Sequence, residues 1–400
     1  MRLSSYEIIL PLVGTDECKN KEEPTMNNPF FPEIHGKFGF GCMRLPEVNG
    51  EIDLAHFSDM VDAFLAAGLN YFDTAHVYHS GKSEPALKAA LTGRHPREAY
   101  LLADKLSNST FETEAEIHPL FARQLELLGV DYLDFYLMHA QNARSFEKYK
   151  ACRAYETALA LKAEGRIRHV GLSFHDTAEV LDRILTEYPQ MEFVQIQFNY
   201  LDDGDPAVDS RRVYETCVKH GKPVIVMEPI KGGTLVKLPE EDKARYAALG
   251  KSPAEMALRY AAGFPQMMMV LSGMSELAQV QENVSFMAPA LPLDETELAA
   301  VEAVRDHLRS LKLIGCTGCR YCVDGCPMGI LIPDMFHALD FRSQRHDWNQ
   351  DRYYRTVLTK DHGKASECLS CGACEAVCPQ GLPIRDYLAQ IAGKFEAKED

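Results

Sequence analysis

Two cysteine runs near the C-terminus carry the most specific chemistry in this sequence. Each run places three cysteines at intervals of three residues and adds a fourth immediately before a proline. Thiolates at this spacing hold iron–sulfur clusters, and four of them suit one [4Fe–4S] group. The cysteines are Cys316, Cys319, Cys322 and Cys326 in the first run, and Cys368, Cys371, Cys374 and Cys378 in the second. The sequence therefore predicts two [4Fe–4S] clusters.

The duplicated run resembles that of bacterial ferredoxins with two clusters, in which the fourth cysteine of each run ligates the cluster of the other run. The resemblance implies one cluster on Cys316, Cys319, Cys322 and Cys378, and a second on Cys368, Cys371, Cys374 and Cys326. Zinc is the alternative, since four thiolates also bind zinc, but zinc sites do not usually have three evenly spaced cysteines followed by Cys-Pro. Disulfides are disfavoured because cysteines three residues apart favour a shared metal.

A second set of reactive side chains lies in the first half of the chain. Asp73, Lys105 and His139 each end a short apolar run, and Tyr78 lies five residues after Asp73. The Tyr78 hydroxyl is the type of group that protonates a carbonyl oxygen while hydride reaches the carbon. Since a free tyrosine is a poor acid at neutral pH, we expect the Lys105 ammonium to lower the pKa of Tyr78. Asp73 would hold Lys105 in place, and His139 would orient the carbonyl or share the proton relay.

The pattern of apolar residues along the chain predicts the strands and helices that must bring these side chains together. Short apolar runs alternate with segments of helical period, and the helices include 53–67 and one capped by Asp176. Eight strands are predicted at 38–43, 69–75, 100–106, 133–139, 168–174, 193–200, 223–229 and 267–274. Eight such pairs over about 250 residues predict an α/β fold, a (β/α)8 TIM barrel, with chemistry at the C-terminal ends of its strands.

The rival fold is a doubly wound sheet. Its first strand usually leads into a Gly-x-Gly-x-x-Gly turn, and GFGCMRLP does not match that pattern.

Any one of the four reactive residues alone is more often a cap, a solvated charge or a packing residue. Their placement at consecutive strand ends favours a site.

This part of the chain resembles the aldo-keto reductase family. The resemblance rests on FDTAHVYHSGKSE (72–84), ADKL, YLMH, GRIRHVGLSFHD (165–176), QIQFNYLD (195–202), VMEPIKGG (226–233) and SGMSELAQVQEN (272–283). It implies a barrel that binds NADH or NADPH in extended form and transfers hydride to an aldehyde or ketone, with Asp73, Tyr78, Lys105 and His139 as the catalytic tetrad. It also implies that Ser173 and Gln195 hold the nicotinamide carboxamide. The parts implied to wrap the pyrophosphate and the adenosine end are the loop with Pro229, Lys231, Gly232 and Gly233 and the segment with Gly273, Gln279 and Asn283.

Departures from the family pattern bear on the cofactor. Met227 stands where the family often stacks an aromatic residue on the nicotinamide. In NADPH-preferring members Lys and Arg bind the 2′-phosphate, whereas the matching positions here are Gly273 and Gln279, with Glu276 close by. Because a 2′-phosphate needs cationic partners, the choice between NADH and NADPH stays open, with Lys231 as a partial substitute.

The chain divides into three predicted regions. Residues 1–30 are expected to form a disordered or extended tail, because the stretch is polar and has two prolines, and Met26 is a second candidate for the start. Residues 31–295 are expected to form the barrel. Residues 296–400 are expected to form a mostly helical ferredoxin-like domain, with a helical arm inserted between Cys326 and Cys368.

Composition excludes several classes of protein. A formal net charge of −16 argues against a nucleic-acid partner. No apolar run has the length of a membrane span and no secretory pattern opens the chain, so we expect no membrane partner and a cytoplasmic location. The remaining cysteines are too far apart for a local site and are expected to be packed or surface thiols: Cys18, Cys42, Cys152 and Cys217.

The role of the clusters is the main open question. A nicotinamide gives two electrons as hydride, whereas clusters take one at a time, and no flavin motif is readable between them. The clusters are therefore structural, or pass electrons to a bound flavin or a redox partner protein, or sense redox state. We predict an NAD(P)H-dependent oxidoreductase acting on a small-molecule carbonyl. An iron–sulfur electron-transfer protein that feeds a barrel-bound flavin or redox partner is the alternative, and a regulatory binding protein is the third hypothesis.

Overall fold

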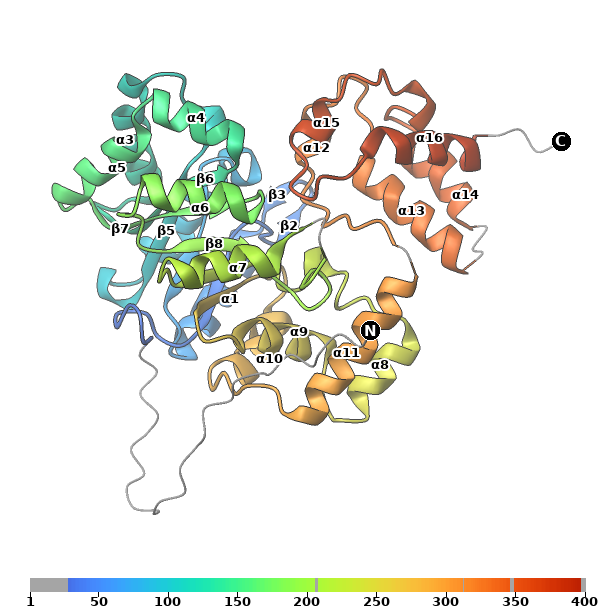
Figure 1. Cartoon of the computed structure of the whole chain (residues 1–400), viewed down its shortest axis with the longest axis horizontal. Coiled ribbons are helices and arrows are strands. Elements are labelled where there is room, and N and C mark those ends of the chain that lie inside the picture. Colours follow the sequence, from blue (N-terminus) through green and yellow to red (C-terminus); the bar gives the residue numbers. More distant parts are fainter. Residues whose placement is uncertain (1–27, 206–207, 312, 346–348, 397–400) are drawn as a thin grey trace, which may run out of the picture.

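Eight parallel strands close into a barrel in the larger lobe of the molecule (Figure 1). The computed structural model describes residues 28–205, 208–311, 313–345 and 349–396, so Cys18, Met26 and most of the expected tail lie outside the described residues. The barrel strands are β1 (Phe38–Gly41), β4 (Tyr71–Asp73), β5 (Leu101–Leu106), β6 (Leu133–Gln141), β7 (Ile167–Phe174), β8 (Val194–Gln197), β9 (Val224–Met227) and β10 (Met267–Gly273). Each strand pairs with the next one along the chain, and β10 closes on β1. The predicted TIM barrel is confirmed.

A short hairpin of β2 (Glu47–Val48) and β3 (Glu51–Ile52), which the sequence did not signal, follows β1. Helices lie in the other connections between the barrel strands. The helices are α1 (Leu54–Ala66), α2 (Ser83–Leu87), α3 (Ile117–Leu128), α4 (Ala143–Ala151), α5 (Ala154–Ala163), α6 (Ala178–Glu187), α7 (Ser210–Lys219), α8 (Glu240–Ala247), α9 (Pro253–Ala262) and α10 (Leu277–Met287). No helix among the described residues is long and apolar enough to cross a membrane.

The predicted helix caps have different outcomes. Asp53 caps α1 as expected, and its side chain accepts the N–H of His56 at 3.0 Å. The expected cap of α6 by Asp176 is wrong, because the helix begins one residue later, with Thr177 at the cap position. The Asp176 carboxylate instead accepts the N–H of Ala143 at 2.8 Å, at the start of α4. Asp176 therefore joins two neighbouring loops at the strand ends.

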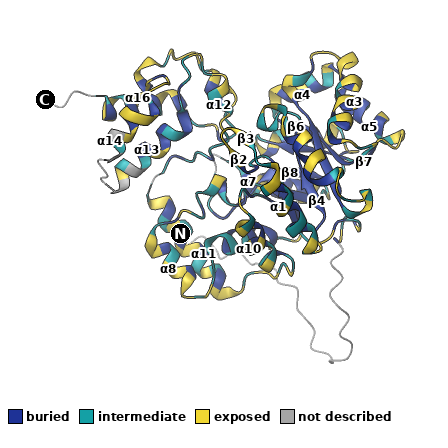
Figure 2. Cartoon of the chain, turned by 180° about the vertical axis from the view of Figure 1, so that it is seen from behind, coloured by how far each residue is buried: buried dark blue, intermediate teal, exposed yellow. Residues whose placement is uncertain are grey.

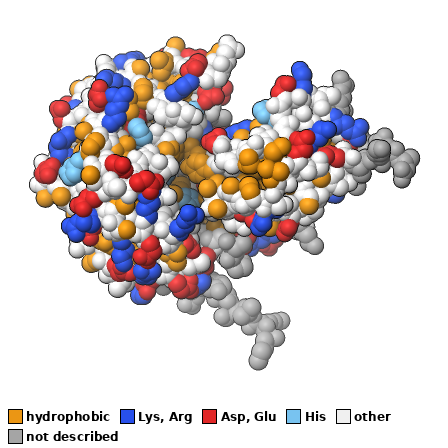
Figure 3. Space-filling model, turned by 90° about the horizontal axis from the view of Figure 1, so that it is seen from above, with side chains coloured by type: hydrophobic (Ala, Val, Ile, Leu, Met, Phe, Trp, Pro, Cys, Tyr) orange, Lys and Arg blue, Asp and Glu red, His pale blue; other side chains and the backbone are white. Residues whose placement is uncertain are grey.

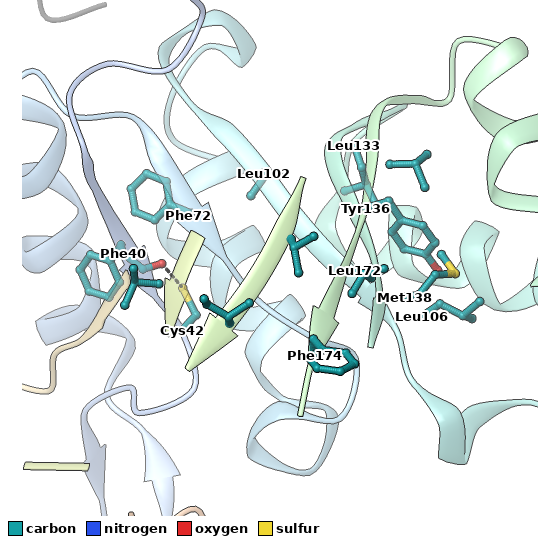
Figure 4. Close-up of a cluster of buried hydrophobic side chains, with 14 of the residues drawn as sticks. Phe40, Cys42, Phe72, Leu102, Leu106, Leu133, Tyr136, Met138, Leu172 and Phe174 are labelled. Atoms are coloured by element: carbon teal, nitrogen blue, oxygen red, sulfur yellow. Dashed lines mark hydrogen bonds between the residues drawn. The ribbon is translucent and has the colours of Figure 1, made fainter. Parts of the chain in front are cut away.

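The core follows the alternation of the strands, and Figure 2 shows the strands buried under the helices. On β5, Leu102 packs outward toward the helices, whereas Leu101 and Ala103 pack into the barrel interior. Outward-facing side chains of neighbouring strands, including Phe40 and Phe72, join Leu102 in one cluster (Figure 4). Three of the remaining cysteines are packed thiols in this cluster, as expected: Cys42, Cys152 and Cys217.

Helix α11 (Glu295–Ser310) packs on the barrel although it directly precedes the cysteines. Its Val301, Val304 and Leu308 are buried against side chains of α8 and α9. Arg259 of α9 and Glu297 of α11, both 8% exposed at their side chains, form a two-bond ion pair at 2.9 Å for each bond. The expected domain division at residue 295 stays a prediction, and this packing favours a boundary after Ser310.

The cysteine-rich module, residues 313–396, is helical, as expected, and has no strand among its described residues. Its helices are α12 (Tyr321–Asp324), α13 (Ile332–Arg345), α14 (Asn349–Tyr353), α15 (Ala373–Ala376) and α16 (Ile384–Phe395). The expected inserted helices are present between the cysteine runs as α13 and α14, and Phe336 and Leu339 of α13 pack in one core with Leu388 and Ile391 of α16. Tyr354 stacks on Phe395 in the same core, with ring centroids 4.9 Å apart.

The ion pair between α9 and α11 gives a test of this packing. Glu297→Ala leaves Arg259 buried without its main partner, which costs about 3 kcal/mol when a buried pair is broken. We expect a clear fall in the free energy of unfolding, measured by chemical denaturation. Glu302→Ala, on the exposed face of the same helix, is the matched control. Equal stability of the two variants would contradict the role given to the pair.

Candidate active site and cysteine cages

A buried ion pair lies at the C-terminal ends of β4 and β5. The Lys105 ammonium donates to the Asp73 carboxylate at 2.6 Å and to the Thr74 carbonyl oxygen at 2.7 Å. The same ammonium is 3.3 Å from the hydroxyl of Tyr78, which begins a short 3-10 turn after β4. Asp73 is 3% exposed and Lys105 1%, so each charge depends on the other to offset the cost of burial. Three of the four predicted catalytic residues are thus hydrogen-bonded together.

His139, near the end of β6, stands beside this group. Its ring centroid is 6.0 Å from that of Tyr78, and its Nδ1 is 2.6 Å from the Ser107 hydroxyl. Burial, with the positive charge of Lys105 and the neighbouring His175, holds the pKa of His139 well below its usual value. His139 is therefore neutral at physiological pH. With the Ser107 hydroxyl as donor to Nδ1, the ring proton lies on Nε2, the tautomer that can donate to a carbonyl oxygen.

The pKa of Tyr78 shifts in the opposite direction from the one expected. Burial and the negative charge of Asp73 raise it well above its usual value, and Arg44 opposes this shift. The prediction of a lowered pKa is wrong because the Lys105 charge is matched by Asp73 at 2.6 Å. Tyr78 therefore keeps its proton across the neutral range, as a proton donor must.

Two residues predicted to hold a nicotinamide carboxamide lie in the same pocket. Ser173 on β7 and Gln195 on β8 are register partners on adjacent strands. Both line the pocket that also contains Asp73, Tyr78 and His139. The Gln195 amide donates to Asp73 at 3.4 Å, and the Ser173 hydroxyl accepts the N–H of Ala140 at 2.8 Å. An amide and a hydroxyl side by side at the tetrad suit the nicotinamide end of a dinucleotide.

The loop predicted to hold the pyrophosphate, Pro229–Gly233, is covered by the cysteine-rich module. Gly232 has a φ of +61°, and a Cβ there would lie 1.8 Å from the carbonyl oxygen of Thr317. Lys231 is 4% exposed and donates to the Asp202 carboxylate, so its charge is already matched inside the protein. The Thr317 backbone therefore covers this loop at Gly232, whereas no atom lies within 4 Å of a Cβ built at Gly233.

The residues predicted at the adenosine end are used within the fold. Gln279 caps α10 by accepting the N–H of Ser275 at 2.8 Å, and Glu276 lies 3.4 Å from His56. Asn283 is buried in α10, and Gly273 lines the mouth of the pocket.

Arg44, in the loop after β1, is a site residue that the sequence reasoning missed. It lines the pocket and donates to the Thr317 carbonyl oxygen at 3.1 Å. It also approaches Glu228, at 3.5 Å. Its place just beyond a strand end was an available signal, because that is where barrels of this type carry their chemistry.

The eight cysteines of the two runs line two cavities in the module. The first cage is lined by Cys316, Cys319, Cys322 and Cys378, and the second cage by Cys326, Cys368, Cys371 and Cys374. Each cage thus takes three cysteines from one run and one from the other. Among the described residues, no three His, Cys, Asp or Glu side chains converge on a single metal ion. Four thiols spread around an apolar cavity suit a [4Fe–4S] group better than one zinc ion.

The module forms one side of the pocket lined by Asp73, Tyr78 and His139, which we call the tetrad pocket. Thr317, Cys319, Tyr321 and Gln380 line the pocket with the barrel residues. Gln380 and Gln197 of β8 exchange two buried amide hydrogen bonds, of 2.9 and 2.7 Å. In the space-filling view a hollow between the two lobes contains apolar and histidine side chains (Figure 3). Apart from the nearby cysteines, nothing in the sequence signals that these module residues contact the barrel.

Comparison with known proteins gives matches for both parts of the chain. The model of the aldo/keto reductase family matches residues 37–306, and the model of a 4Fe-4S dicluster domain matches residues 315–382. L-galactose dehydrogenase of Arabidopsis thaliana is 27% identical over 68% of this chain and 91% of its own length. NADH-specific methylglyoxal reductase of Escherichia coli is 26% identical over 50% of this chain and 65% of its own length.

Solved structures resemble the barrel. An aldo-keto reductase of Bacillus halodurans in its holo form is 25% identical, with a TM-score of 0.53, over 68% of this chain and 93% of its own. An aldo-keto reductase of Klebsiella pneumoniae in complex with NADPH has the same fold, with 21% identity and a TM-score of 0.54, over 67% of this chain and 90% of its own.

The contact at Gly232 gives a test of the docked arrangement. Gly232→Ala places a methyl group against the Thr317 backbone and strains a left-handed residue, at a cost of about 1–3 kcal/mol. We expect faster hydrogen–deuterium exchange in the peptides that contain Thr317 and Gln197. Gly233→Ala is the control, because it has a φ of +98° but no atom within 4 Å of its Cβ. The same exchange in both variants would contradict close docking.

Proposed function

Because this chain belongs to the aldo/keto reductase family, we propose that it reduces an aldehyde or ketone with NAD(P)H through Asp73, Tyr78, Lys105 and His139. The observation that carries the proposal is the hydrogen-bonded group that the buried Asp73 and Lys105 form with the Tyr78 hydroxyl at the strand ends. The substrate is a small-molecule carbonyl compound. The eight cluster thiols need a reducing compartment, and we place the reaction in the cytoplasm.

Each residue has one role in this proposal. The nicotinamide, when bound beside Ser173 and Gln195, supplies the hydride. Tyr78 gives its proton to the carbonyl oxygen, and Lys105 stabilises the phenolate that remains. Asp73 holds the Lys105 side chain in position. Neutral His139 donates a hydrogen bond that orients the carbonyl.

The relatives support this choice of reaction and bear on the cofactor. One relative is named as an NADH-specific reductase of methylglyoxal, a small carbonyl compound, and one structural neighbour binds NADPH. In this chain Gln279 is a helix cap and Glu276 is acidic, so neither offers a cation to a 2′-phosphate. Lys231, the expected substitute, is matched by Asp202. These contacts favour NADH.

Removal of the proton donor tests the proposal. We expect Tyr78→Phe to lower kcat for NADH-dependent carbonyl reduction by about 10²- to 10⁴-fold, because the carbonyl oxygen loses its proton source. Steady-state kinetics on a panel of small aldehydes and ketones would measure it. Tyr188→Phe, at the end of α6, is the control and should retain full activity. Full activity in Tyr78→Phe would reject the role of the hydroxyl.

The two pKa shifts predict a pH profile. The raised pKa of Tyr78 means that its acid form is lost only as pH rises above its usual range near 10. The lowered pKa of His139 means that its neutral form is lost only as pH falls below its usual range near 6.5. We therefore expect kcat/KM for carbonyl reduction to stay flat between about pH 7 and pH 9. A clear inflection within that interval would contradict the assignments.

A further inference from the structure

One layer of residues separates the tetrad pocket from the first cage. Thr317, Cys319 and Gln380 line both cavities, and we refer to these three residues as the shared wall. Cys319 is itself one of the four thiols of the first cage. A compound bound at Tyr78 therefore lies across the shared wall from whatever the first cage holds.

The second cage continues this line toward the surface. Ile332 lines the second cage and Pro333, the next residue, lines the first, so the start of α13 lies between the two. The same is true of α16, where Arg385 lines the second cage and Ile384 the first. Cys371 of the second cage is exposed to solvent. The order from outside inward is solvent, second cage, first cage, shared wall and tetrad pocket.

We propose that the shared wall is an electron-exchange contact, and that the tetrad pocket accepts a quinone-class compound which is reduced there by electrons from the cages. Iron–sulfur groups pass electrons singly, so the acceptor must be stable after gaining one electron. Quinones meet this requirement, whereas simple aldehydes and ketones do not. The inference uses the carbonyl pocket of the proposed function but does not need a nicotinamide.

The pocket has the chemistry that such a ring requires. Met43, Met227 and Leu271 supply apolar contacts from the barrel, and Tyr321 supplies an aromatic ring from the module. Tyr78 and His139 supply hydrogen-bond donors at one end, where a quinone oxygen would lie.

The reaction balances with two electrons and two protons. Both C=O groups of the quinone become C–OH groups. A reduced iron–sulfur or flavin electron-carrier protein would be the one-electron donor at the exposed Cys371, and clusters held by the two sets of cysteines would together supply the two electrons that are needed. Tyr78 gives one proton and regains it from solvent, and solvent supplies the second proton through the open side of the pocket.

The test follows the oxidation state of the clusters directly. The cluster-loaded full chain is reduced anaerobically with half a mole of dithionite per cluster, which supplies one electron to each, and mixed with 1,4-naphthoquinone in a stopped-flow instrument. Return of the visible absorbance of oxidised clusters gives the rate. Met227→Trp fills the pocket, and we expect it to slow this rate about 10- to 100-fold, because the quinone no longer reaches the shared wall. Val218→Trp, exposed on α7, should leave the rate unchanged.

A second electron acceptor distinguishes reoxidation in the pocket from reoxidation at the protein surface. Cytochrome c is too large to enter the pocket, so it should reoxidise wild type and Met227→Trp at the same rate. If Met227→Trp loads less iron than wild type, His175→Trp, which fills the pocket from the end of β7, replaces it. Reoxidation by naphthoquinone at the wild-type rate in an iron-replete pocket variant would overturn the inference.

The outcome is independent of the nicotinamide reaction. NADH-dependent carbonyl reduction is measured on the same wild-type preparation. If carbonyl reduction is absent while Met227→Trp slows the naphthoquinone reaction, the proposed function fails and the shared wall stands. If carbonyl reduction is present while naphthoquinone reoxidises Met227→Trp at the wild-type rate, the inference fails and the proposed function stands.

Discussion

The carbonyl oxygen of Thr317 lies so close to the backbone of Gly232 that a side chain there would collide with it. This contact ties the segment between two cluster cysteines to a loop at the mouth of the barrel. The Arg44–Thr317 hydrogen bond and the Gln197–Gln380 pair hold the same docked arrangement from other sides. Because of this docking, the pocket is built from two parts of the chain, and its chemistry depends on both.

Inside the pocket, the burial of Lys105 sets the protonation states of its neighbours. An ammonium that is 1% exposed needs a carboxylate, and Asp73 supplies it at 2.6 Å. Burial and the negative charge of Asp73 raise the pKa of Tyr78, which therefore keeps its proton. His139 responds to burial and to Lys105 and stays uncharged. A neutral acid and a neutral hydrogen-bond donor result, which suits carbonyl reduction over a broad pH range.

The sequence predicted the parts of this molecule that leave a local signal. The strands could be predicted because apolar runs alternate with helical segments. Asp73, Lys105 and His139 could be predicted as site residues because they lie near the ends of consecutive strands. The grouping of Cys378 with the first run and of Cys326 with the second followed from the resemblance to two-cluster ferredoxins and matches the two cages. The docking of the cysteine-rich module on the barrel leaves no local signal in the sequence. Gln197 and Gln380 lie 183 residues apart, and nothing periodic marks either one. The direction in which the pKa of Tyr78 shifts could not be predicted from the sequence either, because it depends on burial and on the distances among Tyr78, Asp73 and Lys105.

Electron paramagnetic resonance of the reduced, cluster-loaded protein tests the central claim, that the barrel pocket and the first cage share a wall. The spectrum would be recorded without and with saturating NAD⁺ or a non-reducible carbonyl ligand, with binding verified by calorimetry. The account predicts that a bound ligand alters the signal of one cluster, the one beside Thr317, Cys319 and Gln380, and leaves the other unchanged. A bound ligand that leaves both signals unchanged would contradict it.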